Sequence, residues 1–179
     1  YLFEFTYHNP TQIVFGPNSF AKLGGLVPAD AKVLLLYGGG SIKGNGVYNK
    51  VMAALAGREV VEFAGVEPNP TLETLSAAVD LAKRQNIGFI LGVGGGSVAD
   101  GAKYIACAAL YDGDGWDIVS GRHFPKVALP VGIVLTLPAT GSESNVGAVV
   151  TRKATHEKRV FYVPPARPRF AVLNPEVMS

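Results

Sequence analysis

The stretch Phe89–Ser97, which reads FILGVGGGS, decides the fold of this chain. Its first five residues form an apolar run of β-strand length, and its last four are Gly94, Gly95, Gly96 and Ser97. Small residues then recur at helical spacing, at Ala99, Ala102, Ala106 and Ala109. A strand that ends in glycines and restarts as a helix leaves backbone N–H groups unpaired, and these groups and the helix dipole favour a phosphate. The stretch therefore predicts a strand, a phosphate-binding turn and a helix.

The same arrangement occurs earlier in the chain. VLLLY at Val33–Tyr37 is followed by Gly38, Gly39, Gly40 and Ser41, and a helix is expected at Val47–Ala56. A single glycine-rich turn is equally well explained by the tight chain reversal that glycine permits. Two such turns, each behind an apolar strand, predict a nucleotide with more than one phosphate group.

The segments around these turns alternate between strand and helix patterns. Short strands are expected at 11–15, 59–63 and 131–135, and helices at 18–26, 71–85 and 97–109. Thr71 is expected to cap the helix at 71–85, with Glu73 in its first turn. The alternation predicts one α/β domain over residues 1–179, with a parallel sheet flanked by helices. Residues from about 130 to 175 are more β-rich, with strands at 146–152, 159–163 and 169–173, and predict an appended β-hairpin region.

The composition limits the possible functions. Hydrophobic residues make up 48% of the 179 residues and charged residues only 17%, below the roughly 25% of typical soluble domains. Some apolar surface is therefore expected to be covered by a partner chain or by another domain, and we expect a homodimer. The net charge of +2 comes from scattered Lys and Arg, which gives no basis for nucleic-acid binding.

Neither a membrane span nor a disulfide is expected. The longest apolar stretch, Val127–Ala139, is short and is interrupted by Pro130 and Pro138, so it cannot span a bilayer. Cys107 is the single cysteine, which excludes an intrachain disulfide and favours a reducing compartment, the cytoplasm. Its place among helical alanines predicts a buried packing thiol.

The second glycine turn matches the dinucleotide fingerprint only in part. Gly94–Ala99 has the G-x-G-x-x-A form, but an ordinary Rossmann site also needs an acidic residue at the end of the next strand. The acids at about that distance, Asp112, Asp114 and Asp117, fall in a turn-rich loop. The ordinary fingerprint therefore fails at this turn.

The first turn departs from the fingerprint in another way. Glu62 stands near the end of the following strand, but Lys43 occupies the third fingerprint position. Small neutral residues beside a lysine leave room and positive charge for a 2′-phosphate, which favours NADP over NAD as the coenzyme. The alternative is that Lys43 is an ordinary solvated surface charge.

A third polar element, TLPATGSESN at Thr136–Asn145, follows a strongly apolar strand. A helix start capped by Thr140 or Ser142 would explain part of it. Six polar side chains in so short a window exceed what a cap needs, and we interpret the segment as part of a binding site.

Together these segments resemble a known family. GGGS followed by Asp100, EPNP at Glu67–Pro70 and the PATGSESN loop are similar to the iron-containing alcohol dehydrogenases, in particular to their branch of NADPH-dependent butanol dehydrogenases and aldehyde reductases. The resemblance covers nearly the whole chain. It implies a dehydroquinate-synthase-like, Rossmann-related α/β fold that binds a dinucleotide.

The resemblance also implies roles for single residues in coenzyme binding. The adenosine ribose would lie beside Gly38, Gly39, Gly40 and Ser41, and Asn69 would lie along the coenzyme. The pyrophosphate would be held by Gly94, Gly95, Gly96 and Ser97. The nicotinamide half would be surrounded by Asp100, Thr136, Thr140, Ser142 and Asn145, and Lys158 would reach a ribose.

The family's metal ion, Fe²⁺ or Zn²⁺, is held by one aspartate and three histidines of a helical second domain, which the resemblance places beyond Ser179. The histidines of this chain are His8, His123 and His156, without a His-x-x-x-His pair, and all are expected on the surface. We therefore expect neither a metal ligand nor a catalytic residue in this chain.

The resemblance implies that the parent enzyme transfers hydride between NADPH and a small aldehyde or alcohol, with the metal polarising the carbonyl. The 179-residue chain alone is expected to be inactive. Three alternatives stay open: a glycerol or glycerol-1-phosphate dehydrogenase, a dehydroquinate synthase that would bind NAD, and a non-catalytic nucleotide-binding or dimerisation module. The strand at Thr11–Phe15 and the low charge are compatible with a dimer.

Overall fold

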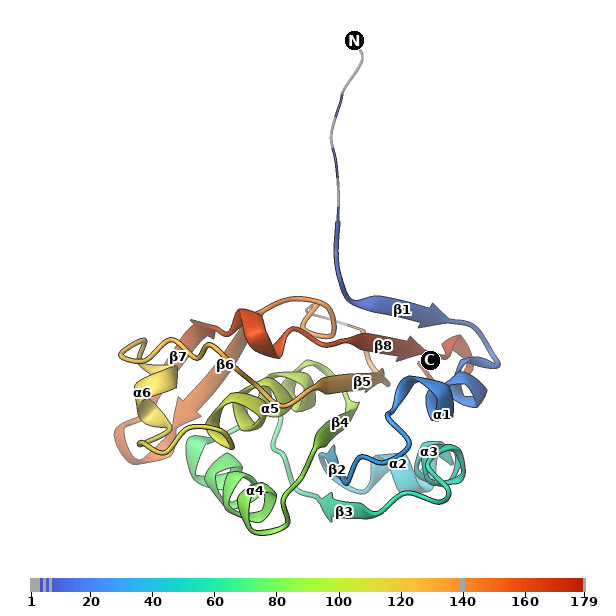
Figure 1. Cartoon of the computed structure of the whole chain (residues 1–179), viewed down its shortest axis with the longest axis horizontal. Helices are drawn as coiled ribbons and strands as arrows, with labels where there is room; N and C mark the ends of the chain where they lie inside the picture. Colours follow the sequence, from blue (N-terminus) through green and yellow to red (C-terminus); the bar gives the residue numbers. More distant parts are fainter. Residues whose placement is uncertain (1–3, 5, 7, 139–140, 179) are drawn as a thin grey trace.

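A six-stranded parallel β-sheet forms the centre of the molecule (Figure 1). The computed structural model describes residues 4, 6, 8–138 and 141–178. Across the sheet the strands follow the order β1-β8-β5-β4-β2-β3. Their bounds are Gln12–Phe15 (β1), Val33–Tyr37 (β2), Val60–Phe63 (β3), Phe89–Gly94 (β4), Val131–Leu135 (β5) and Phe170–Leu173 (β8). The α/β architecture expected from the sequence is confirmed.

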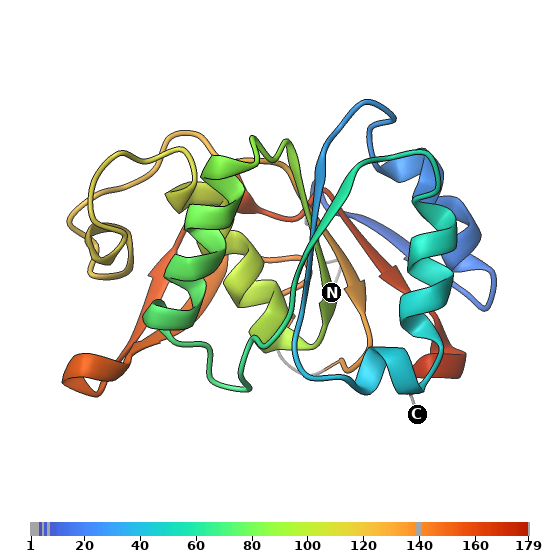
Figure 2. The same cartoon turned by 90° about the horizontal axis from the view of Figure 1, so that it is seen from below.

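Helices cover both faces of the sheet (Figure 2). One face carries α1 (Leu23–Leu26), α2 (Ser41–Gly44) and α3 (Val47–Ala54), and the other carries α4 (Leu72–Arg84) and α5 (Gly96–Ala108). Successive side chains of a strand point to opposite faces, so the residues of β2 and β5 pack alternately against the two helical layers. Both strands are buried throughout, which explains their unbroken apolar sequences.

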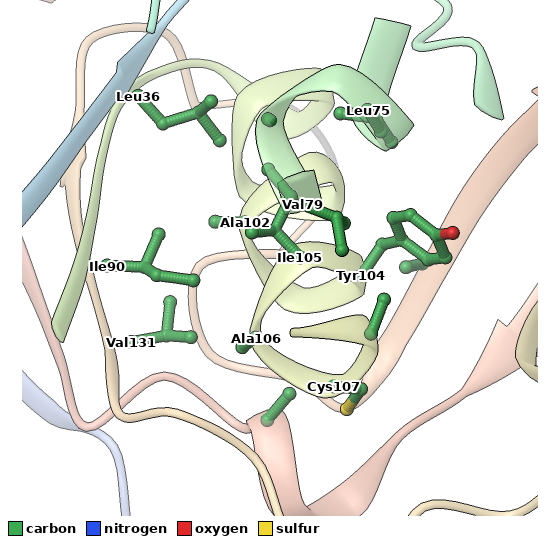
Figure 3. Close-up of a cluster of buried hydrophobic side chains, with 14 of the residues drawn as sticks. Leu36, Leu75, Val79, Ile90, Ala102, Tyr104, Ile105, Ala106, Cys107 and Val131 are labelled. Atoms are coloured by element: carbon green, nitrogen blue, oxygen red, sulfur yellow. The ribbon is translucent and has the colours of Figure 1, made fainter. Parts of the chain in front are cut away.

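The helix α5 lies deepest in the core, and its small side chains bring it close to the sheet. Figure 3 shows Ala102 and Ala106 of α5 beside Ile90 and Val131 of the sheet. A Cβ at Gly101 would lie only 3.0 Å from a side-chain methyl group of α4. The small residues of this stretch therefore fix the spacing between α5, α4 and the sheet.

Cys107 lies near the end of α5 and is buried. Burial raises the pKa of its thiol to about 12, so the reactive thiolate does not form near neutral pH. The sequence-based interpretation of Cys107 as a packing residue is confirmed.

The expected hairpin is formed by β6 (Gly147–Arg152) and β7 (Glu157–Tyr162), which pair antiparallel. The hairpin covers fewer residues than the region predicted from about 130 to 175. The strands before and after it, β5 and β8, belong to the central sheet, where they pair with each other. The sequence predicted these strands but not which of them would pair. The remaining short elements are α6 (Trp116–Val119) and the 3₁₀ turns Lys153–Thr155, Pro164–Ala166 and Pro175–Val177.

The helix predicted at 18–26 is broken. A 3₁₀ helix, Ser19–Lys22, precedes the single turn of α1, and the side chain of Asn18 makes no capping hydrogen bond. Gly24 and Gly25 weaken the helix, and Gly24 allows a close contact, because a Cβ there would lie 3.0 Å from the carbonyl oxygen of Ala54. No helix in the described ranges has the length and apolarity needed to cross a membrane.

Candidate functional site

The two glycine turns lie next to each other at the carboxyl ends of β2 and β4, which pair in parallel. After β2 the chain turns toward the face covered by α3, whereas after β4 it turns toward the opposite face, covered by α5. Neighbouring parallel strands whose connections diverge in this way leave a crevice outside their carboxyl ends. The topology thus places both turns on the two sides of one crevice.

At this crevice the surface forms a cleft with a volume of about 560 Å³. The first turn contributes Gly38, Gly39 and Ser41 to its lining, and the second contributes Gly94–Ser97. Thr136, which follows β5, lines the cleft from the next strand across the sheet. These predicted site residues are therefore brought together. Gly40 is instead the N-cap residue of α2.

The second turn has the geometry that its sequence predicts. Gly94 has φ +157°, and a Cβ there would lie 2.7 Å from Cγ2 of Val98, so no other residue fits without rearrangement. Gly95 is the N-cap residue of the 13-residue helix α5 and provides no capping side chain. The first amides of α5 are therefore left for an external acceptor at the positive end of the helix dipole.

The first turn differs from the second. Its helix, α2, has only four residues and ends before Gly46, whose φ of +82° starts α3 in a new direction. A helix of only four residues has a small dipole. The first glycine turn therefore provides room for a ligand beside its backbone but only a weak site for an anion. A Cβ at Gly39 would meet nothing within 4 Å, whereas one at Gly38 would lie 3.1 Å from the carbonyl oxygen of Val66.

The EPNP segment reaches the cleft because Glu67 fixes it to the start of α4. The Glu67 carboxylate accepts hydrogen bonds from the Thr71 hydroxyl (3.0 Å), the Thr74 hydroxyl (2.8 Å) and the Thr71 amide (3.3 Å). Burial alone would raise the pKa of Glu67, but hydrogen bonds from its own backbone amide, from Thr74 and from Thr71 together outweigh it and lower the pKa. Thr71 caps α4 as predicted, accepting from the Thr74 amide at 3.2 Å.

A smaller cavity of about 220 Å³ adjoins the cleft. Its lining includes five predicted site residues, namely Asn69, Gly96, Ser97, Asp100 and Lys158. The Ser97 hydroxyl donates to the carbonyl oxygen of Pro68, which joins the second turn to the EPNP segment. Lys158 comes from the hairpin, far away in sequence.

The hairpin that carries Lys158 is held by a residue that sequence reasoning assigned only to the first turn of a helix. The two carboxylate oxygens of Glu73 accept hydrogen bonds from the amides of Lys153 and Ala154, each at 3.0 Å. Burial alone would raise the pKa of Glu73, but these amides outweigh it and lower the pKa. The hairpin is thereby fixed to the start of α4.

Asp100 links α5 to the polar segment after β5. One of its carboxylate oxygens accepts from the Ser142 hydroxyl, and the other accepts from the Val149 amide at 3.1 Å. Burial raises the pKa of Asp100, although Ser142, Lys103 and the Val149 amide favour the charged form. A third cavity, of about 270 Å³, is lined by Asp100, Ser142 and Asn145 among others. Thr140 lies outside the described residues.

Lys103 is the site residue that the sequence analysis missed. It is fully buried, and its ammonium group donates to the carbonyl oxygens of Ser142 (2.8 Å), Asn145 (3.4 Å) and Gly147, and to Oδ1 of Asn145 at 2.9 Å. Burial lowers its pKa to about 8, with Asp100 and Glu143 opposing the shift. The available signal was its position three residues after Asp100, which puts both side chains on one face of α5.

At the far side of the first turn, Glu62 and Lys43 form a cluster with two tyrosines. The Glu62 carboxylate accepts from the hydroxyls of Tyr37 (2.9 Å) and Tyr48 (2.7 Å), so both of its oxygens are engaged. The Lys43 ammonium lies 4.9 Å from the ring centre of Tyr48 and 5.8 Å from that of Tyr37. These cation–π contacts hold the amine near the first turn, although Lys43 does not line the cleft.

No group of three His, Cys, Asp or Glu side chains suited to a metal ion occurs among the described residues. His8 and His156 are exposed, and His123 stacks on the ring of Tyr111 with 4.2 Å between ring centres. The described part of the chain thus offers no metal centre.

A doubly wound parallel sheet with a cleft at the divergence of two strands is the architecture of Rossmann-related α/β proteins. The chain belongs to the iron-containing alcohol dehydrogenase family, whose model matches residues 10–175. The family resemblance noted from the sequence is confirmed, and the family consists of oxidoreductases.

Relatives in several bacteria cover the chain almost completely. The NADPH-dependent aldehyde reductase YqhD of Escherichia coli is 52% identical over 175 residues, which are 96% of this chain and 45% of that protein. The probable NADH-dependent butanol dehydrogenase 1 of Bacillus subtilis has the same identity and coverage. The crystal structure of NADH-dependent butanol dehydrogenase A from Thermotoga maritima superposes with a TM-score of 0.92 at 46% identity, over 97% of this chain and 45% of that one. The chain thus spans about half the length of these relatives.

Proposed function

We propose that this chain binds NADP(H) in the cleft between the two glycine turns, as the coenzyme-binding part of an enzyme that interconverts small aldehydes and alcohols. The observation that carries the proposal is the 560 Å³ cleft at the divergence of β2 and β4, lined by both turns. Its size suits a ligand larger than a single phosphate. Relatives named as aldehyde reductase and butanol dehydrogenases support the substrate class.

In this proposal the pyrophosphate lies over Gly94, Gly95, Gly96 and Ser97, where the free amides and the dipole of α5 compensate its charge. The adenosine ribose lies beside Gly38, Gly39, Gly40 and Ser41. The coenzyme passes Asn69, and Lys158 reaches a ribose. The nicotinamide half is surrounded by Asp100, Thr136, Thr140, Ser142 and Asn145.

The preference for NADP over NAD rests on what surrounds the first turn. Both carboxylate oxygens of Glu62 already accept hydrogen bonds from tyrosine hydroxyls, and these bonds compete with any hydrogen bond to a ribose diol. The ammonium group of Lys43, held over the same tyrosines, supplies positive charge for a 2′-phosphate. One relative is named for NADPH and another for NADH, so the coenzyme preference of this chain is tested by the titration below.

The metal that the family name implies does not fit the described residues, because they contain no cluster of suitable ligands. We assign the iron or zinc ion to the remainder of a longer parent protein. The residues of this chain then bind and orient the coenzyme, and the chain alone is inactive in aldehyde reduction.

We also propose a homodimer contact at the edge strand β1. Among the described residues β1 pairs with β8 alone, and Ile13 and Phe15 on it are 53% and 67% exposed. Association through this edge would cover apolar side chains that a monomer leaves in water.

Calorimetric titration tests the coenzyme proposal. The native chain is expected to bind NADPH at least about tenfold more tightly than NADH, since charge-assisted contacts to the 2′-phosphate contribute about 1.5 kcal/mol or more. Gly39→Asp, at an open position, places a carboxylate beside that phosphate and is expected to reverse the preference, whereas Gly39→Ala controls for size alone. Failure of both coenzymes to bind at millimolar concentration would overturn the proposal.

A further inference from the structure

Residues 141–146 have no regular structure, and β6 begins directly after them at Gly147. This irregular segment carries two of the predicted site residues, Ser142 and Asn145. In the described part, it is tied to the body of the protein largely through side chains that come from elsewhere. Arg167 donates to the carbonyl oxygen of Ser144 at 2.8 Å, and Asn9 donates to the same oxygen at 3.2 Å. Further ties come from α5, through Asp100 and Lys103, and from the Val163 amide, which donates to the carbonyl oxygen of Val146 at 2.8 Å.

Lys103 contributes the most concentrated of these contacts. An ammonium group has three N–H donors and no acceptor, and here it faces four oxygen atoms of Ser142, Asn145 and Gly147. All of them belong to one stretch of six residues. Within the described residues, the hydrogen bonds of this fully buried lysine all go to this stretch and fix it against α5.

The same contacts determine which end of the Asn145 carboxamide faces outward. Lys103 and the Gly147 amide, at 2.9 and 3.1 Å, can only donate, so Asn145 must turn its oxygen toward them. The –NH₂ group of Asn145 is then left to donate to a ligand. Asn145 is exposed and lines the 270 Å³ cavity beside Asp100, where such a ligand would lie.

We propose that Lys103 is a positioning residue for coenzyme binding, which holds residues 142–147 in place and turns the –NH₂ group of Asn145 toward an acceptor oxygen of the nicotinamide half. The inference rests on the proposed binding of NADP in the adjoining cleft. Lys103 itself touches no coenzyme and acts through Asn145 and Ser142. Asp100, one helical turn away, supports the same segment through the Ser142 hydroxyl and the Val149 amide.

A comparison of two ligands tests this inference on the 179-residue chain. Adenosine 2′,5′-bisphosphate contains only the adenosine half of NADP, whereas NADP⁺ also contains the nicotinamide half. Lys103→Met keeps the approximate volume but removes the donors. We expect it to raise the dissociation constant of NADP⁺ about tenfold. The dissociation constant of adenosine 2′,5′-bisphosphate is expected to stay within about twofold of the native value.

Lys83→Met is the matched control, because Lys83 also donates to a backbone carbonyl, that of Tyr111 at 2.8 Å, but lies away from the three cavities of the site. It is expected to leave both dissociation constants unchanged. In a double-mutant cycle, Lys103→Met and Asn145→Ala should weaken NADP⁺ binding together by less than the product of their separate effects, since Lys103 acts through Asn145.

The outcomes separate the two proposals. If the native chain binds neither ligand, the proposed function fails. If it binds both and Lys103→Met leaves the affinity for NADP⁺ within twofold, or weakens both ligands equally in a folded protein, the role of Lys103 is refuted while the function stands. Should circular dichroism show that Lys103→Met is unfolded, Lys103→Gln decides, because it retains two N–H donors. It is expected to weaken NADP⁺ selectively, by about threefold.

Discussion

The two GGGS turns have the same four residues and follow similar strands, but the structures after them differ. After Gly94–Ser97 the chain forms a 13-residue helix, whereas after Gly38–Ser41 it forms a single turn that ends at Gly44. The difference lies in the residues that follow: VADGAK at 98–103 continues one helix, and IKGNG at 42–46 interrupts the other with Gly44 and Gly46. A glycine turn thus provides the reversal, but the downstream residues decide whether a helix dipole stands behind it.

The difference also separates the proposed tasks of the turns. The second turn has free helix amides and suits the pyrophosphate that NAD and NADP share. The first turn has open space at Gly39 and the Lys43–Tyr48 contact nearby, and suits the ribose at which the two coenzymes differ. Binding strength and coenzyme preference are therefore assigned to different turns.

The largest effect is expected from adding one methyl group to the second turn. Gly94→Ala combines a positive φ with a Cβ 2.7 Å from Val98, and should lower the free energy of unfolding by about 2–5 kcal/mol. Gly40→Ala in the first turn, with φ −80° and no atom within 4 Å, should change it by less than about 1 kcal/mol. Urea unfolding measures both. Equal losses in the two variants would show that the turns are equally constrained.

An intermediate effect is expected from acid, through Glu67, which holds the EPNP segment beside the second turn. Because the pKa of Glu67 is lowered from 4.5, its ionised form stabilises the folded chain fully above about pH 4.5, and this contribution is lost as the pH falls through the lowered value. Glu67→Gln should therefore be less stable than the native chain at pH 7, and the difference should shrink as the pH falls below 4.5.

Glu59→Gln serves as the control, because the Glu59 side chain is 78% exposed. Its stability relative to the native chain is expected to stay nearly constant over that pH range. If the stability difference between the native chain and Glu67→Gln did not depend on pH, it would contradict the conclusion that the ionised Glu67 carboxylate holds the EPNP segment in place. Thermal unfolding at each pH measures these differences.

The smallest effect is expected from extending the short helix of the first turn. Gly44→Ala meets no atom within 4 Å and should raise the free energy of unfolding by about 0.5–1 kcal/mol, because alanine favours the helix. Gly46→Ala should lower it by about 1 kcal/mol, since φ +82° disfavours any side chain. If both variants shifted the unfolding midpoint in the same direction, helix propensity would not explain the shortness of α2.

The local elements followed closely from the sequence. The strand at 131–135, the cap of Thr71 on α4 and the buried thiol of Cys107 were all predicted, because strand length, capping and helical spacing depend on neighbours along the chain. The family was also identified from short motifs and then confirmed. The break of the predicted helix at 18–26 was not foreseen, since the contact of Gly24 with Ala54 joins segments thirty residues apart.

The sequence by itself determined that two glycine turns follow two buried strands in a parallel α/β protein, because periodicity and glycine placement are local properties. Only the tertiary structure decided that these turns face each other, that Glu62 is engaged by tyrosines, and that Lys103 is buried among four oxygens. Strand order and the partners of a long charged side chain depend on contacts between residues remote in sequence, and no local pattern encodes them.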